Sequence, residues 1–226
     1  MSAATNRILE VLPDEETIAR RAADVVAASA REAIGARGRF TFAVSGGRTP
    51  WVMFRALADE DLPWDKVGIW QVDERVAPEG HADRNLTNLL PMIPSEADLR
   101  AMPVTDEDLD AAAERYARSL PEVFDLVHLG MGDDGHTASL VPGDPVLEVT
   151  DRDVALTGVY RGLRRMTVTY PVLDRAGSAL WMIDGVDKAP MLPRLLAGDR
   201  SIPAGRVSTV RQLIVADAAA AAEVAP

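Results

Sequence analysis

A short glycine-rich stretch, from Leu129 to Pro142, holds the side chains of this sequence that are best suited to chemistry. Asp133, Asp134 and His136 place two carboxylates and an imidazole close together. Carboxylates accept protons, an imidazole titrates near neutral pH, and glycines allow a ligand to approach the backbone closely. This combination predicts acid–base chemistry on a small molecule. The alternative is an ordinary turn with a solvated histidine, because Gly-Met-Gly-Asp-Asp-Gly is also a good turn sequence.

A second glycine-rich stretch predicts an anion site. It reads Ser45-Gly46-Gly47-Arg48-Thr49-Pro50. The apolar run Phe40–Val44 before it is typical of a strand, and Trp51–Leu57 after it of a helix, with Thr49 as the expected N-cap and Pro50 at the first position. A glycine turn that leads into a helix presents backbone N–H groups to a phosphate or carboxylate. The pattern is neither a Walker loop nor a dinucleotide fingerprint, and a plain capped turn is the alternative.

Charged residues also follow other apolar runs. Asp73-Glu74-Arg75 comes directly after a run that ends at Val72, and Lys188 comes soon after the run Ala179–Asp184. Open parallel sheets place their ligands at the carboxyl ends of the strands, so we expect these side chains at one edge of a sheet. Three arginines beside the expected strand Met166–Thr169 are further candidate anion ligands, unless they form a solvated face: Arg161, Arg164 and Arg165.

The other two histidines suggest no chemistry. His81 lies among loop residues and is expected to be solvated, because one histidine near loop carboxylates does not specify a metal site. His128 falls inside the apolar run Phe124–Leu129, where a buried core histidine is expected.

Apolar runs typical of strands alternate with amphipathic helical segments along the whole chain. Helices are expected from Pro13 to Ile34, from Leu109 to Leu120 with a cap in Thr105–Asp108, and up to Leu196; a last strand at 213–215 precedes a short alanine-rich helix. Such alternation predicts one α/β domain over residues 1–226. Its Rossmann-like sheet should be parallel or mostly parallel, with helices on both faces.

The composition excludes some kinds of site and argues against some classes of binding partner. The chain has 226 residues, no cysteine and a formal net charge of -11. Disulfides and thiolate metal sites are therefore excluded. The negative charge argues against non-specific binding of nucleic acid or of anionic membranes. The N-terminal residues lack the apolar run of a secretory signal, and no run is long enough to cross a bilayer, so a cytoplasmic location is expected.

Three separated motifs in this order resemble those of the 6-phosphogluconolactonases, and the likeness extends through Arg165–Thr169 and Gly185–Lys188. The motifs are Ser45-Gly46-Gly47-Arg48-Thr49-Pro50, Val72-Asp73-Glu74-Arg75 and the segment from Gly130 to Leu140. Glucosamine-6-phosphate deaminases share the first loop and the Asp-Gly-His core. After the histidine they usually read Ile-Ala-Phe-Asn-Glu-Pro, whereas residues 137–142 here read Thr-Ala-Ser-Leu-Val-Pro, without the glutamate that assists the deaminase histidine.

The resemblance implies hydrolysis of 6-phospho-D-glucono-1,5-lactone to 6-phosphogluconate in the pentose phosphate pathway, with no metal and no organic cofactor. It implies that His136 is the general base on water, that Asp134 orients the imidazole and that Arg75 stabilises the oxyanion. A small sugar phosphate is the implied partner, rather than nucleic acid or a membrane, and a monomer or a homodimer is expected. The implied substrate-binding residues are Ser45, Gly46, Gly47, Arg48, Thr49, Asp73, Gly132, Arg165 and Lys188, and the resemblance favours Arg165 over Arg164.

Three positions depart from the usual family pattern. Arg84, Val141 and Asp174 stand where the family commonly has serine, phenylalanine and asparagine, and we expect Arg84 to alter the rim of the pocket. Two other functions stay open at this point. They are an amino-sugar phosphate deaminase–isomerase and a non-catalytic sugar-phosphate-binding protein.

Overall fold

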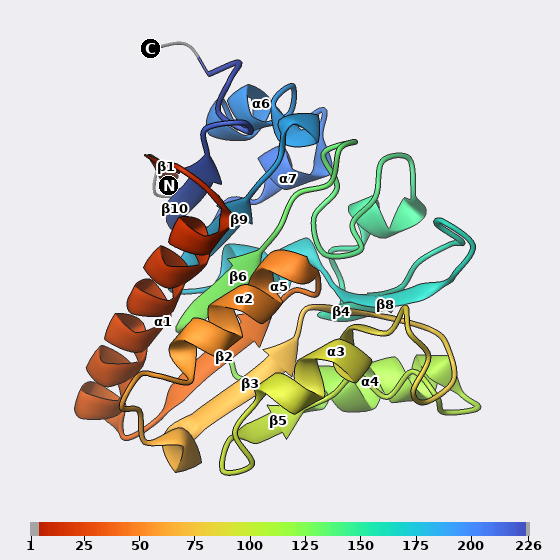
Figure 1. Cartoon of the computed structure of the whole chain (residues 1–226). Coiled ribbons are helices and arrows are strands. Elements are labelled where there is room, and N and C mark those ends of the chain that lie inside the picture. Colours follow the sequence, from red (N-terminus) through yellow and green to blue (C-terminus); the bar gives the residue numbers. More distant parts are fainter. Residues whose placement is uncertain (1–4, 225–226) are drawn as a thin grey trace.

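A seven-stranded parallel sheet forms the centre of the computed structural model, which describes residues 5–224 (Figure 1). The strand order is β1-β10-β9-β6-β2-β3-β5, and each neighbouring pair is parallel. The strands are β1 (Asn6–Leu12), β2 (Phe40–Val44), β3 (Val67–Gln71), β5 (Asp98–Arg100), β6 (Leu126–Leu129), β9 (Ala179–Ile183) and β10 (Arg211–Asp217). The predicted α/β fold with a mostly parallel sheet is confirmed. The predicted domain limits, residues 1 and 226, lie outside the described residues.

Helices cover both faces of this sheet. The α-helices are α1 (Glu15–Arg37), α2 (Arg48–Leu57), α3 (Asn85–Leu89), α4 (Leu109–Ser119), α5 (Tyr170–Asp174), α6 (Leu192–Leu196) and α7 (Pro203–Arg206). In Figure 1, α1 and α2 lie in front of the sheet, where they pack on side chains such as Phe42. Ala43, the next residue of β2, belongs to the second core, which α4, α5, α6 and α7 cover. Successive strand residues point to opposite faces, so one sheet supports two cores.

A smaller antiparallel sheet, which the sequence did not predict, continues from the end of β3. Its strand order is β4-β8-β7, with β4 (Asp73–Arg75), β7 (Val154–Leu156) and β8 (Arg165–Val168). Figure 1 shows β4 and β8 beside the carboxyl end of β3. Short 3₁₀ turns complete the architecture at Trp64–Lys66, Leu90–Met92, Pro145–Glu148 and Val186–Lys188. The small sheet brings β8, late in the sequence, to the early segment that carries Asp73.

The helix caps of α1 and α4 agree with the sequence. The Asp14 side chain accepts a hydrogen bond from the backbone N–H of Thr17, and Asp108 accepts one from Ala111. These carboxylates satisfy N–H groups that have no partner within the helix. The polypeptide leaves α1 at Gly38, whose φ of 78° lies in the left-handed region that glycine adopts readily.

Three predicted details are wrong. Thr49 does not cap α2, because the helix begins at Arg48 and the Thr49 hydroxyl instead donates to Asp184 Oδ1 (2.6 Å). Pro50 is consequently the third residue of the helix rather than the first. The alanine-rich segment after Asp217 forms turns rather than a helix. So short a segment gains too few backbone hydrogen bonds to offset the cost of starting a helix.

No helix in the described part of the chain is a candidate for spanning a membrane. None combines the length and the apolar character that crossing a bilayer requires.

Candidate active site

A cavity of about 230 Å³ lies at the carboxyl edge of the central strands and collects residues from four of the expected strand ends. Its lining includes Ser45 after β2, Asp73 and Arg75 in β4, Gly132 and His136 after β6, Arg165 in β8 and Lys188 after β9. Parallel strands that run in the same direction bring these distant segments to one edge. The structure thus places the proposed base, the two arginines and the lysine around one space.

His136 and Asp134 form the most direct polar contact at this cavity. His136 Nδ1 lies 2.6 Å from Asp134 Oδ1, and the backbone N–H of His136 donates to the same oxygen at 3.0 Å. Burial opposes ionisation of Asp134, but these bonds and one from Tyr160 outweigh it and hold the pKa of Asp134 at about 2. Asp134 is therefore an anion at neutral pH. A carboxylate on Nδ1 favours the imidazole tautomer that keeps Nε2 free to accept a proton.

Gly132 provides the space that the His136 ring occupies. The backbone N–H of Gly132 donates to the His136 carbonyl (2.8 Å), so the loop folds back on itself. A Cβ atom on residue 132 would overlap the imidazole and would also approach Asp134. The glycine is needed here for close approach of backbone and ring.

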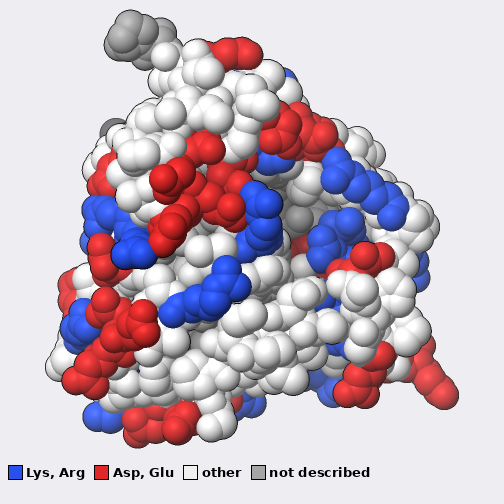
Figure 2. Space-filling view, in the orientation of Figure 1, with Lys and Arg blue, Asp and Glu red and all other residues white. Residues whose placement is uncertain are grey.

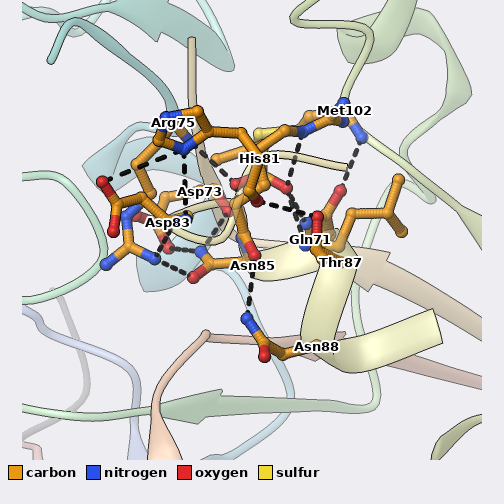
Figure 3. Close-up of polar contacts among 12 residues, drawn as sticks. Gln71, Asp73, Arg75, His81, Asp83, Asn85, Thr87, Asn88 and Met102 are labelled. Atoms are coloured by element: carbon orange, nitrogen blue, oxygen red, sulfur yellow. Dashed lines mark hydrogen bonds and ion pairs between the residues drawn. The ribbon is translucent and has the colours of Figure 1, made fainter. Parts of the chain in front are cut away.

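Arg75 and Asn85 contact each other at the wall of the cavity that both line (Figure 3). Arg75 Nη1 donates to the Asn85 side-chain oxygen and to the backbone carbonyl of Asp83 (2.9 Å). The buried Glu74 carboxylate holds this segment in place, because it accepts from the backbone N–H groups of Arg75, Asn85 and Leu86 at 2.7–2.8 Å. The geometry fixes one side of the Arg75 guanidinium and turns it toward the cavity.

Arg165 approaches the cavity from β8 and is 7% exposed. Its Nη1 lies 3.5 Å from Ser139 Oγ, and Ser139 donates to Asp73 Oδ2 at 2.6 Å. Burial lowers the pKa of Arg165 from its ordinary value. The side chain remains a cation at neutral pH because a guanidinium is so strongly basic. Arg164, the neighbouring residue, is exposed and donates to the Thr157 carbonyl (3.4 Å).

The glycine loop after β2 separates this cavity from an adjoining one of about 330 Å³. Gly46 and Lys188 line both, whereas Gly47, Arg48 and Thr49 line the adjoining one. Lys188 Nζ lies 2.5 Å from Asp187 Oδ2, and the exposed Arg48 side chain contacts Glu15 (2.9 Å) and Asp184 (3.7 Å). The backbone N–H groups of this loop and the Lys188 ammonium therefore lie at one end of the site.

The surface around the hollow carries both signs of charge. Figure 2 shows Lys and Arg side chains gathered around a depression near the middle of the view, with acidic side chains beside them. The whole chain has a net charge of -11, so this local concentration of cations differs from the average surface. Such a cluster in an acidic protein attracts a small anion to one place.

Several residues of the site were not predicted as functional. Tyr160 donates to Asp134 Oδ2 (2.8 Å), Asn85 contacts Arg75, and Ser139 connects Asp73 with Arg165. Arg161, expected only as a general anion ligand, lines the cavity and pairs with Asp133 (2.8 Å). Ser139 lies within a recognised motif and Asn85 directly follows Arg84, a position already compared with the family, so their polar character was a usable signal. Tyr160 gave none.

The remaining expectations concern residues outside the cavity. His81 is exposed and His128 is buried, as predicted. The expectation that Arg84 alters the pocket rim is wrong, because Arg84 is 4% exposed and its Nε lies 3.7 Å from Glu74 Oε2. Val141 is buried in the core, and Asp174 accepts from the backbone N–H of Ser208 (2.7 Å). Within residues 5–224, no three His, Asp or Glu side chains gather in a way that could hold a metal ion.

Comparison with known proteins identifies the family. Residues 13–215 match the family described as glucosamine-6-phosphate isomerases/6-phosphogluconolactonase. The chain belongs to this family. The 6-phosphogluconolactonase of Nostoc sp. is 35% identical over 96% of this chain and 98% of that protein. The enzyme of the same name from Rattus norvegicus is 34% identical over 92% of this chain and 89% of its own length.

Solved structures of the family share the fold. The crystal structure of a 6-phosphogluconolactonase from Shewanella baltica superposes with a TM-score of 0.87 at 23% identity, over 96% of this chain and all of that one. A monomeric glucosamine-6-phosphate deaminase gives a TM-score of 0.81 at 17% identity, over 95% of this chain and 99% of that one. The fold is thus common to both activities, and the side chains must distinguish between them.

Proposed function

We propose that this protein is a 6-phosphogluconolactonase, which hydrolyses 6-phospho-D-glucono-1,5-lactone to 6-phosphogluconate in the pentose phosphate pathway. The observation that supports this most directly is the composition of one cavity. The His136 imidazole, paired with an anionic Asp134, lines the same space as Arg75, Arg165 and Lys188. An ester with a phosphate at its far end needs a base at one place and cations at another.

His136 is the proposed general base. Asp134 occupies Nδ1, so Nε2 accepts a proton from a water molecule as the water oxygen forms a bond to the lactone carbonyl carbon. The negative charge of Asp134 stabilises the imidazolium that results. Asp134 also fixes the ring orientation, since its Oδ1 accepts from both Nδ1 and the backbone N–H of His136.

Arg75 is the proposed oxyanion stabiliser. Among residues 5–224, both hydrogen bonds of its side chain use Nη1, and a guanidinium carries five N–H groups, so donors are left for the carbonyl oxygen. When the tetrahedral intermediate collapses, the bond between the carbonyl carbon and the ring oxygen breaks. The imidazolium of His136 returns its proton to that oxygen. The products are a carboxylic acid and a hydroxyl group, so one water is consumed and no redox step occurs.

The phosphate of the substrate is proposed to bind at the loop end of the site. Gly46, Gly47 and Thr49 supply backbone N–H groups, and Lys188 and Arg165 supply charge. Ser45 would turn its hydroxyl group from the His128 carbonyl to the phosphate. Arg48 lies at the exposed end of the adjoining cavity and would contact the phosphate from outside. Asp73, held by Ser139 and Asn85, is proposed to accept a hydrogen bond from a sugar hydroxyl. Gly132 lines the same cavity and is proposed to contact the substrate through its backbone.

The segment after His136 disfavours the deaminase alternative. Thr137, Ser139, Leu140 and Val141 are buried, and this segment contains no carboxylate. A deaminase of this family would need its glutamate near the histidine. The sugar-phosphate-binding alternative would keep the anion ligands without rate enhancement, so kinetics separate it from the enzyme.

The test is a direct assay with freshly generated lactone, corrected for its spontaneous hydrolysis. Acid release that depends on the protein and saturates with lactone supports the proposal. Ammonia release from glucosamine 6-phosphate would support the deaminase instead. Binding of 6-phosphogluconate with no acceleration of ring opening would identify a binding protein and overturn the proposal.

The proposal also covers the partner, the location and the oligomeric state of the enzyme. The charge of -11 supports a small-molecule substrate rather than nucleic acid or an anionic membrane as the partner, and the proposed location is the cytoplasm. The protein is proposed to act as a monomer or a homodimer. Light scattering coupled to size-exclusion chromatography distinguishes the two.

A further inference from the structure

Tyr160 reaches the site from a segment that none of the recognised motifs includes. It lies in the hairpin between β7 and β8, where Tyr160 and Leu163 exchange backbone hydrogen bonds of 3.0 and 3.3 Å. The two residues between them, Arg161 and Gly162, both have positive φ values, 49° and 84°. That backbone is typical of the tight hairpin turns that match the twist of paired strands. The turn therefore presents Tyr160 from a defined position.

The hydroxyl group of Tyr160 contacts the residues proposed for proton transfer. It donates to Asp134 Oδ2 at 2.8 Å, while the other oxygen, Oδ1, lies 2.6 Å from His136 Nδ1. The Tyr160 and His136 rings also meet edge to face, with centroids 5.4 Å apart and an interplanar angle of 65°. Both carboxylate oxygens of Asp134 thus have hydrogen-bond partners, and the imidazole packs against the tyrosine ring.

The ring of Tyr160 contacts the residues proposed for anion binding. The guanidinium carbon of Arg165 lies 5.0 Å from the ring centroid, and that of Arg161 lies 5.2 Å from it. These distances are within the range of cation–π contacts. Arg161 is further restrained by Asp133, at 2.8 Å. One side chain therefore contacts both the proposed acid–base pair and two cations of the cavity.

We propose that Tyr160 is a positioning residue that aligns the two ends of the site. Its hydroxyl group fixes Asp134 next to Nδ1 of His136, and its ring fixes the guanidinium of Arg165. This inference rests on the proposed function, because the reaction that is measured is lactone hydrolysis. Tyr160 acts through Asp134 and Arg165 and needs no contact with the reacting atoms. Its two contributions are chemically separable, since one needs the oxygen and the other needs only the aromatic ring.

Two substitutions separate these contributions. Tyr160→Phe keeps the ring and removes the hydroxyl group, so kcat should fall about tenfold, as for a lost hydrogen bond to a charged group, with KM nearly unchanged. Tyr160→Leu removes the ring as well. We expect a similar fall in kcat together with a rise in KM of about fivefold, because Arg165 loses its aromatic contact.

The pH profile provides a signature that a purely structural role would not give. The charged and titratable groups that line the cavity with His136 or contact its ring are Asp73, Arg75, Asp133, Asp134, Tyr160, Arg161, Arg165 and Lys188. Among them, Tyr160 withdraws negative charge from Asp134 through its hydrogen bond. Without the hydroxyl group, Asp134 stabilises an imidazolium more strongly, so the acidic limb of the kcat/KM profile should move to higher pH in Tyr160→Phe.

Tyr170→Phe is the matched control. Tyr170 also donates a hydrogen bond from its hydroxyl group, to the Pro203 carbonyl at 3.0 Å, but within the described residues it makes no hydrogen bond to Asp134 or His136. This variant should lower the thermal stability without moving the pH profile. If Tyr160→Phe and Tyr170→Phe alter stability alike and leave kcat and the pH profile as in the wild type, the positioning role is overturned.

A measurement without substrate keeps this inference distinct from the proposed function. The ¹⁵N chemical shifts of the His136 ring report its tautomer and its titration in wild type and in Tyr160→Phe. An inactive wild type would overturn the lactonase function, and a changed His136 signal in the variant would still support positioning by Tyr160. An unchanged signal together with unchanged kcat would overturn the positioning role in an active enzyme. If the wild type is inactive, an unchanged His136 signal in Tyr160→Phe would by itself overturn the positioning role.

Discussion

His128 and His136 belong to one strand and the loop that follows it, yet their surroundings differ in the features that matter for proton transfer. His128 lies within β6, is 1% exposed, and its Nε2 has no hydrogen-bond partner in the part of the chain that the structure describes. Its Nδ1 accepts from the backbone N–H of Ser45 (3.4 Å), and burial lowers the pKa of His128 to about 3. His136 has an 18% exposed side chain and a carboxylate 2.6 Å from Nδ1.

The difference shows what turns an imidazole into a base. A protonated ring at position 128 would be a buried charge without a counter-ion, so His128 stays neutral and serves the core and the Ser45 loop. At position 136 the charge is balanced by Asp134, and the cavity gives water access to the ring. The same side chain is structural in one environment and suited to catalysis in the other.

Replacement of His136 tests the comparison most strongly. His136→Ala should reduce kcat/KM for lactone hydrolysis by roughly a hundredfold or more, because it removes the proposed general base. The partly exposed side chain contributes little to the core, so the melting temperature should change little. Initial rates on freshly prepared lactone provide the measurement. Activity near that of the wild type would remove His136 from the role of base.

Replacement of Asp134 tests whether the carboxylate makes the difference between the two histidines. Asp134→Asn keeps a hydrogen-bond acceptor for Nδ1 but removes the charge that balances the imidazolium, so kcat should fall about tenfold to a hundredfold. The acidic limb of the kcat/KM profile should also move to lower pH, since protonation of the ring becomes less favourable. A profile that stays in place would show that Asp134 does not act on His136 electrostatically.

Two adjacent arginines extend the comparison to the anion ligands. Arg165 is buried at the cavity, and Arg164 is exposed beside it. Arg165→Lys should raise KM for the lactone about tenfold with a smaller effect on kcat, because an ammonium cannot reproduce the directed N–H groups. Arg164→Lys is the matched control and should leave KM within about twofold. Equal effects of the two substitutions would contradict the assignment of Arg165.

The sequence predicted the parts of the molecule that follow from strand direction. Once Val44, Val72, Leu129 and Ile183 are placed at the ends of parallel strands, the polar residues after them must lie at one edge, as they do. The buried position of His128 followed in the same way from its place within an apolar run. These predictions needed only local pattern and the general topology of α/β sheets.

The missed features depend on contacts between distant segments. Tyr160 reaches Asp134 because β8 pairs with both β4 and β7 in a separate antiparallel sheet, which no local pattern indicated. Thr49 has the sequence of a helix cap, but Asp184 provides a tertiary partner for its hydroxyl group. Arg84 reads as a rim residue, and the buried Glu74 draws it inward. In each case a tertiary hydrogen bond or ion pair overrode the local preference.

Replacement of His128 should have the smallest effect on activity and the clearest effect on pH-dependent stability. His128→Asn retains an acceptor for the Ser45 N–H, so kcat/KM should stay within about threefold of the wild type. In the wild type, the unfolded chain binds a proton at residue 128 below pH 6.5, whereas the folded chain does so only near pH 3. Stability from this group is therefore present above pH 6.5 and is lost as the pH falls toward 3. Urea unfolding at pH 7 and pH 5 should show a loss about 2 kcal/mol larger for wild type than for His128→Asn. Equal losses would mean that His128 is not kept neutral by the fold, and its contrast with His136 would then rest on the carboxylate alone.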